Sequence, residues 1–227
     1  MKRGMNLTSL LVCAGLLLAS QVHAATATLV LNTGVDANDV AMSAGSLDPN
    51  WSISTDGGST FGAAKVAFPA QVCCGMETVD ATAVWITDQS VTSDSSATAW
   101  GVNQVVILRR TFDLSGLDSG SAELHGVWRV ADNTVGISLN GQEIVGAVNG
   151  FTFGADQALP ADGEAGLFAS GLNTLEIRGS SLNSTFDAAY FNGRVTALAP
   201  EPVPVPPTFW LFGPALGGLG FLRRRIA

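Results

Sequence analysis

Ionisable side chains are scarce in this sequence, and their scarcity excludes several kinds of chemistry. Only 13% of the 227 residues are charged, and there are two histidines, three cysteines and one tyrosine. A Ser-His-Asp triad would have to use His125, and neither G-x-S-x-G nor H-E-x-x-H occurs. His125 and one adjacent cysteine pair supply too few ligands for an ordinary zinc site. We therefore assign no catalytic residue and predict that the chain is not an enzyme.

Basic residues are also few away from the ends of the chain. Lys2, Arg3 and residues 223–225 account for five of them, which leaves six basic and nineteen acidic residues in 25–202, a net charge of −13. Such a surface repels phosphate backbones and anionic lipid headgroups. We expect no nucleic-acid partner, whereas divalent cations, neutral sugars and basic partners are compatible with this charge.

The first 24 residues have the pattern of a signal peptide. Lys2 and Arg3 precede the apolar run 10–19, and Val22-His23-Ala24 is a small-x-small cleavage site for signal peptidase. An uncleaved membrane anchor is the alternative, but the run is short for a spanning helix of about 20 residues. Residues 1–24 are predicted to form a signal helix that is removed during export across the inner membrane.

The end of the chain has three successive parts. Residues 199–207 (APEPVPVPP) form a proline-rich stalk, residues 208–222 are apolar and uncharged, and Arg223, Arg224 and Arg225 follow. The arginines should hold this end in the cytoplasm while the rest is exported. Residues 208–227 are therefore predicted to be a hydrophobic helix that inserts transiently into the inner membrane. An ordinary C-terminal transmembrane anchor is the alternative.

This tail closely resembles the PEP-CTERM sorting signal of Gram-negative bacteria. The resemblance rests on Pro200, Glu201 and Pro202, the stretch 203–206, residues 210–213 and the three arginines. It implies processing by an exosortase-type transpeptidase, in a host that makes exopolysaccharide or biofilm matrix. It also implies a membrane-anchored form that becomes a cell-surface or extracellular protein after processing.

Between the two ends, short alternating runs separated by Gly, Asn, Asp and Ser predict one all-β sandwich over residues 25–198. Strands are expected at 26–32, 51–54, 83–86, 105–114, 122–130, 135–139, 142–145, 172–178 and 188–197. In the fifth of these, Leu124 and Trp128 should face the core and His125 the opposite side. Asn140-Gly141 predicts a two-residue hairpin turn.

The order of these pieces over residues 100–197 resembles the galactose-binding-like jelly roll. The motifs are Arg110–Leu114, Trp128, the Asp132-Asn133 turn, the hairpin 137–141 and residues 171–177. The resemblance implies a jelly-roll β-sandwich of the kind found in sugar-binding modules that accompany glycoside hydrolases. These motifs are structural and carry no binding site with them.

Three tryptophans are candidates for carbohydrate contact: Trp51, Trp85 and Trp100. An exposed indole stacks on sugar rings, and packing in the core is the alternative.

Cys73 and Cys74 are candidates for a disulfide, which would be either a strained vicinal ring or bonds to another chain. Buried free thiols and redox chemistry are the alternatives.

Calcium is the one cofactor that the sequence leaves open, since loop Asp and Asn side chains supply hard oxygen ligands. The candidates are Asp48 with Asn50, Asp56, and Asp132 with Asn133, and turn formation is the alternative.

The sequence as a whole is compatible with three functions. The first is a non-catalytic surface or matrix protein that binds extracellular polysaccharide. The others are a secreted glycan-degrading enzyme that uses two carboxylates and a purely structural matrix component.

Overall fold

The protein is described by a computed structural model, which covers residues 24–68, 76, 82–90, 92–93, 100–159, 166–182 and 187–200. Every regular element in this part of the chain is a β-strand, and residues 25–200 form one compact unit. The prediction of an all-β domain is confirmed. Apart from Ala24, the expected signal helix (1–24) and sorting helix (208–227) lie outside the described residues. Among the described residues there is no helix with the length and apolar character needed to span a membrane.

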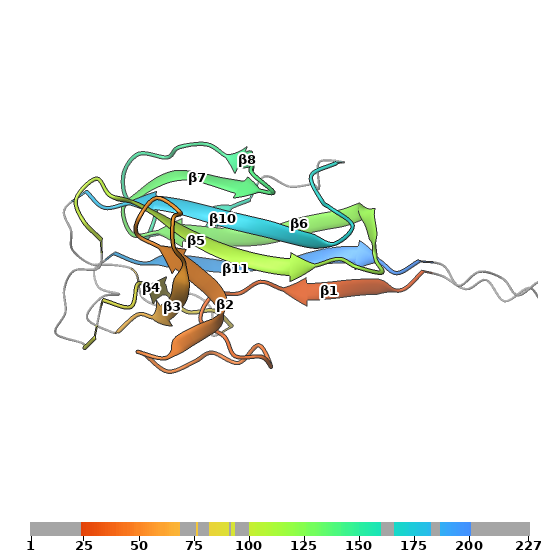
Figure 1. The fold of residues 1–227 in the computed structure, drawn as a ribbon, viewed down its shortest axis with the longest axis horizontal. Helices are drawn as coiled ribbons and strands as arrows, with labels where there is room; N and C mark the ends of the chain where they lie inside the picture. Colours follow the sequence, from red (N-terminus) through yellow and green to blue (C-terminus); the bar gives the residue numbers. More distant parts are fainter. Residues whose placement is uncertain are drawn as a thin grey trace, which may run out of the picture. The chain divides into compact units, whose positions relative to one another are not determined.

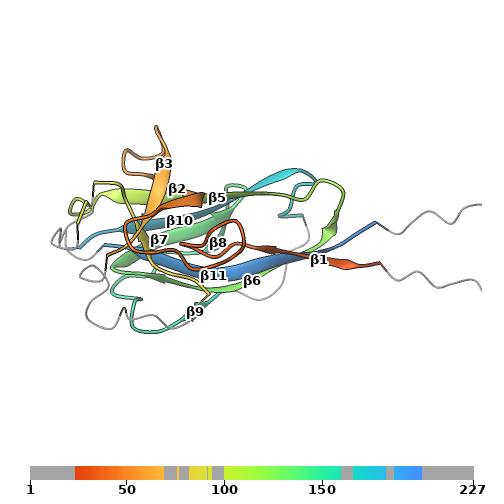
Figure 2. The same cartoon turned by 90° about the horizontal axis from the view of Figure 1, so that it is seen from below.

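The strands are β1 (Thr26–Val30), β2 (Leu47–Ser54), β3 (Gly62–Val66), β4 (Ile86–Thr87), β5 (Val105–Asp113), β6 (Asp118–Val130), β7 (Asn133–Leu139), β8 (Gln142–Val145), β9 (Gln157–Ala158), β10 (Leu172–Ser180) and β11 (Ala189–Leu198). Their order is β8-β7-β10-β5-β2-β3-β4-β11-β6-β9, and β1 pairs with β11. All pairings between these strands are antiparallel. The sheet curls so that β10 and β5 lie over β11 and β6, a sandwich-like arrangement (Figures 1 and 2).

The space between the two layers is filled by one large hydrophobic cluster. Leu108 and Ile177 reach it from β5 and β10, and Trp128, Phe191 and Val195 reach it from β6 and β11. The alternation predicted for β6 is confirmed, because Leu124 and Trp128 are buried in this cluster and His125 is half-exposed. Burial of apolar surface at roughly 25 cal/mol per Å² makes this cluster the main stabilising feature of the domain.

A second, smaller cluster lies on the outer side of the β6–β11 layer. Tyr190 and Val127, which alternate with the inward-facing residues of β11 and β6, pack there against Trp85, Met76 and Phe153. The chain between β1 and β5 therefore covers part of this face. Another part of the same face, where the end of β1 lies beside β11, carries the candidate site described below.

The local turn prediction holds and two strands were missed. Asn140 and Gly141 both have positive φ (52° and 80°), as a two-residue hairpin turn with matching twist requires. β3 was not predicted because its sequence, GAAKV, has little apolar alternation, and its pairing with β2 and β4 is a tertiary contact. β9 is only two residues long, and β6 begins four residues earlier than expected.

The two ends of the domain are adjacent. Ala199 N–H donates to the Ala25 carbonyl at 2.7 Å, and Thr26 pairs with Leu198. Both chain ends therefore leave the domain from the edge where β1 begins and β11 ends (Figure 1).

Candidate functional site

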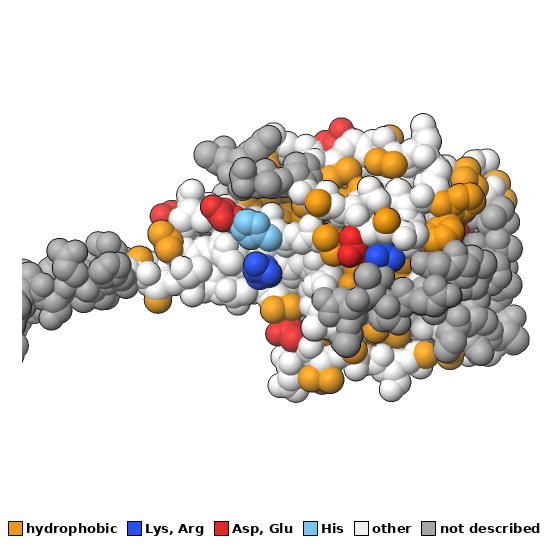
Figure 3. Space-filling view, turned by 180° about the vertical axis from the view of Figure 1, so that it is seen from behind, with side chains coloured by type: hydrophobic (Ala, Val, Ile, Leu, Met, Phe, Trp, Pro, Cys, Tyr) orange, Lys and Arg blue, Asp and Glu red, His pale blue; other side chains and the backbone are white. Residues whose placement is uncertain are grey.

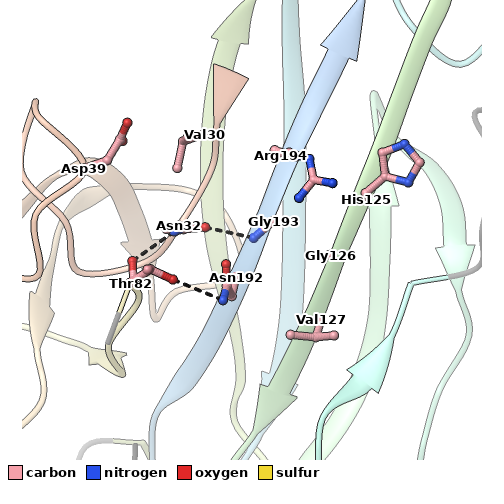
Figure 4. Close-up of a pocket in the computed structure, with 10 residues that line it drawn as sticks. All are labelled: Val30, Asn32, Asp39, Thr82, His125, Gly126, Val127, Asn192, Gly193 and Arg194. Carbon is pink, nitrogen blue, oxygen red and sulfur yellow. Dashed lines mark hydrogen bonds between the residues drawn. The ribbon is translucent and has the colours of Figure 1, made fainter. Parts of the chain in front are cut away.

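A hollow lies on the outer face of the β11–β6 pair, beside the end of β1. Its volume is about 460 Å³, within the range of about 300–1,000 Å³ typical of small-ligand sites. It is lined by Val30, Asn32, Asp39, Thr82, His125, Gly126, Val127, Asn192, Gly193 and Arg194 (Figure 4). Figure 3 shows this face of the molecule, where the pale blue histidine lies beside one basic and one acidic side chain.

The floor of the hollow is a pair of glycines in facing strands. Gly193 pairs with Gly126, so His125 and Arg194 project from neighbouring positions on one side of this pair, and Val127 and Asn192 on the other. A Cβ on Gly193 would lie 2.6 Å from the His125 carbonyl oxygen and 2.7 Å from the Phe191 ring on the core side. The buried ring thus occupies the space that side chains at 126 and 193 would need.

One rim of the hollow is held rigidly by hydrogen bonds. Asn32 Nδ2 donates to the Thr82 carbonyl at 2.9 Å, and Asn32 Oδ1 accepts from the Gly193 N–H at 2.9 Å. Asn192 Nδ2 donates to Thr82 Oγ1 at 3.3 Å. Figure 4 shows these two amides and Thr82 gathered on one side of the glycine pair. Three segments far apart in the sequence therefore present a fixed set of amide and hydroxyl groups.

The opposite rim carries charged groups that face solvent. His125 Nε2 lies 3.0 Å from Glu123 Oε2. Arg194 is exposed, and within the described residues its guanidinium makes no hydrogen bond or ion pair; Arg109, Arg129 and Arg178, by contrast, are each paired with a carboxylate. In a domain with only six basic residues, an unpaired arginine at a hollow is an available hydrogen-bond donor.

The side chains around this hollow are suited to binding a ligand by hydrogen bonds. Amide, guanidinium, imidazole and carboxylate groups lie around a short apolar surface formed by Val30 and Val127. Hydroxyl-rich ligands are bound in this way, by several directed hydrogen bonds beside a small apolar face. In the described part of the chain the only hydrogen-bond partner of the His125 ring is the exposed Glu123, and no hydroxyl or thiol nucleophile is hydrogen-bonded to it.

The three predicted tryptophans are not at this hollow, and the structure places all of them in the interior. The Trp51 Nε1–H donates to the Leu31 carbonyl at 3.0 Å, and its ring packs 5.8 Å from that of Phe191. The Trp85 Nε1–H donates to the Met76 carbonyl at 2.6 Å. A buried ring has no face for a sugar, so packing in the core, the alternative reading, describes these residues.

Trp100 is buried for a different reason. A Cβ added at Gly179 would lie 2.9 Å from the Trp100 ring, so the indole lies directly against the β10 backbone. Whether a tryptophan is exposed depends on what other segments place over it, and the local sequence does not contain that information.

Of the calcium candidates, Asp48 with Asn50 is occupied by the protein's own donors. Asp48 accepts from the backbone N–H groups of Gly34 (2.6 Å), Asn50 (2.8 Å) and Trp51 (3.0 Å). Arg110 Nη1 donates to Asn50 Oδ1 at 2.7 Å. Burial raises the pKa of Asp48, while these backbone donors and the charge of Arg110 counteract the increase. A cation here would have to displace the guanidinium.

Asp56 forms a self-contained turn. Its carboxylate accepts from the Thr60 N–H (2.9 Å), Thr60 Oγ1 (2.7 Å) and Ser54 Oγ (2.7 Å). These hydrogen bonds, with Thr60 the main donor, hold its pKa well below the ordinary range. The turn-forming alternative accounts for this residue.

The third candidate, Asp132, belongs to a buried acidic group that was not predicted as a set. Asp132 Oδ2 accepts from the Leu182 N–H at 2.6 Å, and Asn133 Oδ1 accepts from the Gly150 N–H at 2.6 Å. Two further buried carboxylates, Asp88 and Asp187, interact electrostatically within this group. Among the described residues, no three His, Cys, Asp or Glu side chains converge on one metal position.

Several predicted residues lie outside the described part of the chain. They are Cys73 and Cys74, and the sorting-motif residues Glu201, Pro202, Arg223, Arg224 and Arg225; Pro200 is described and is exposed. Comparison with known proteins gave no further assignment: no protein-family model, curated protein or solved structure matches the chain.

Proposed function

We propose that this chain is an exported, non-catalytic protein of the cell surface or extracellular matrix whose β-sandwich binds carbohydrate. The observation that carries the proposal is the hollow on the β11–β6 face, with its fixed amides on one rim and, on the other, Arg194, which has no ion-pair partner among the described residues. Neutral polysaccharide suits this site better than an acidic polymer, because the surrounding domain has a strong negative charge.

The jelly-roll type, the export route and the processing of the tail are inferred from the sequence. The strand motifs support a galactose-binding-like jelly roll, with which a curled antiparallel sheet is compatible. The signal-like residues 1–24 support export by way of signal peptidase. The tail at Pro200–Pro202 and Arg223–Arg225 supports transient inner-membrane insertion and processing by an exosortase-type transpeptidase.

The proposal is tested by screening the purified full-length chain against a panel of neutral and acidic polysaccharides, and by titrating the best ligand into variants. A hydrogen bond to a charged group contributes about 1.5–3 kcal/mol, so Arg194→Ala should weaken binding by about tenfold or more. Arg178→Ala removes the same charge from β10 in the other layer and should leave the affinity unchanged.

Three outcomes contradict the proposal. No binding across the panel would exclude carbohydrate recognition by this chain. Equal affinities of the wild type and Arg194→Ala would move the site away from the hollow. Turnover of the bound polysaccharide would favour the enzymatic alternative instead.

A further inference from the structure

A second candidate site lies inside the domain, at the end opposite the chain termini. Asp88 follows β4, Asp132 lies between β6 and β7, and Asp187 precedes β11. Strand pairing brings these segments together, because Val130 pairs with Ala189 and Asn133 with Ser180. The β11 end that pairs with β1 is at the other side of the sheet.

All three carboxylates are removed from water. The exposed fractions of Asp88, Asp132 and Asp187 are 5%, 2% and 0%. No described lysine or arginine forms an ion pair with any of them. Buried carboxylates are normally paired with a cationic group or a metal, since an isolated buried charge is strongly unfavourable.

Two of the carboxylates are incompletely hydrogen-bonded. Asp187 Oδ2 accepts from the Trp100 N–H at 3.2 Å and Asp88 Oδ1 from the Ser90 N–H at 2.6 Å, but Asp187 Oδ1 and Asp88 Oδ2 have no hydrogen-bond partner among the described residues. Buried polar atoms are almost always satisfied in native proteins. Within the described residues, two buried carboxylate oxygens of this acidic group thus lack a donor, and a bound cation would satisfy both.

The electrostatics agree with this interpretation. Burial raises the pKa of Asp187 to about 6, and the negative charges of Asp132 and Asp88 add to the increase. Ser181 Oγ lies 3.4 Å from Asp132 Oδ2 and also interacts with the Asp187 carboxylate, so these two acids are close neighbours. The domain therefore concentrates like charges where water is excluded, which disfavours the ionised form.

We propose that a calcium ion binds at this buried acidic group, held by the Asp88 and Asp187 carboxylates, with Asp132 and Ser181 beside them. Every side-chain ligand in the described group is a hard oxygen, which favours calcium over zinc. Calcium takes six to eight ligands, including backbone carbonyls and waters, so three converging carboxylates are not required. The ion would link the ends of β4, β6 and β10 to the start of β11.

The proposal is independent of the carbohydrate site and is tested by thermal unfolding. The purified full-length chain is freed of metal with EDTA, and its unfolding midpoint is measured at neutral pH with and without about 10 mM CaCl₂. For a dissociation constant of about 10⁻⁴–10⁻³ M, as in extracellular modules, calcium should raise the midpoint by about 3–10 °C. Isothermal titration should give one ion per chain.

Two variants assign the ion to these residues. Asp187→Asn and Asp88→Asn keep the side-chain shape but remove one negative charge, so both should fold in EDTA and lose the calcium-dependent rise. Glu143→Gln removes an exposed carboxylate on β8, which pairs with Ser138 of β7 and so lies several residues along that strand from Asp132, and it should keep the full rise.

The proposal fails if calcium does not change the wild-type midpoint, or if Asp187→Asn keeps the full rise. In the first case, an Asp187→Asn protein that is more stable than the wild type in EDTA would show that protonation, and not a metal ion, neutralises the buried carboxylates. In the second case, calcium binds elsewhere on the acidic surface.

Discussion

Gly193 is the position where a single added methyl group should disturb both the core and the hollow. Its Cβ would lie 2.6 Å from a backbone oxygen of His125 and 2.7 Å from two ring carbons of Phe191. Real Cβ contacts are essentially never shorter than 3.0 Å, so something must shift. The Phe191 ring is fully buried and packs against Trp51, so moving it would disturb the core.

We predict that Gly193→Ala lowers the free energy of unfolding by about 2 kcal/mol, within the range of overpacked cores. For a domain of this size that corresponds to a fall in the thermal midpoint of roughly 4–8 °C. Urea unfolding followed by tryptophan fluorescence measures the difference. Gly154→Ala is the matched control, because its Cβ would have no heavy atom within 4 Å; it should stay within about 0.5 kcal/mol of the wild type.

A double variant separates the two contacts. Phe191→Leu in the Gly193→Ala background removes the ring contact but leaves the His125 carbonyl contact, so it should show a coupling of at least about 0.5 kcal/mol. A Gly193→Ala protein as stable as the wild type, or two strictly additive effects, would refute the packing argument.

Two further predictions concern buried carboxylates. Burial raises the pKa of Glu176, but hydrogen bonds from Arg109 and Arg178 outweigh this effect, so the pKa of this carboxyl lies below its ordinary value. The stability that the ionised Glu176 contributes is therefore present above about pH 4.5 and is lost as the pH falls through the lowered pKa. Glu176→Gln removes this contribution, so its urea-unfolding midpoint should fall less steeply between neutral and acidic pH than that of the wild type. An unchanged pH dependence of the midpoint would contradict this prediction. Asp48→Ala leaves three backbone N–H groups without their acceptor and should cost about 3 kcal/mol in the same assay. A loss below about 1 kcal/mol would show that water replaces the carboxylate.

Much of the fold could be predicted because its signals are local. The alternation in β6 works because each strand of a sandwich buries one face, and Asn140-Gly141 specifies its turn through its own backbone preferences. The predicted strand positions were less accurate where a strand forms only by pairing with segments that are distant in the sequence. β3 has little pattern of its own, and the predicted strand at 83–86 is reduced to Ile86–Thr87.

The sites were less predictable because they are assembled from residues far apart in the chain. The rigid rim joins Asn32, Thr82 and Asn192, and no short motif relates these three positions. Asp132 was singled out as a turn residue, but its neighbours Asp88 and Asp187 come from other loops. The tryptophans proposed to stack on sugar are buried for the same reason, since Trp85 packs against Tyr190 and donates to the Met76 carbonyl, both from other segments.

Ligand recognition at the β11–β6 hollow can be followed residue by residue in an NMR titration of the full-length chain with its best polysaccharide ligand. We predict that the side-chain amide signals of Asn32 and Asn192 and the backbone signals of Gly126 and Gly193 shift together, while those of β7 and β10 do not. Saturating shifts confined to the other layer or to the loops, with these four residues unchanged, would exclude the hollow as the ligand site.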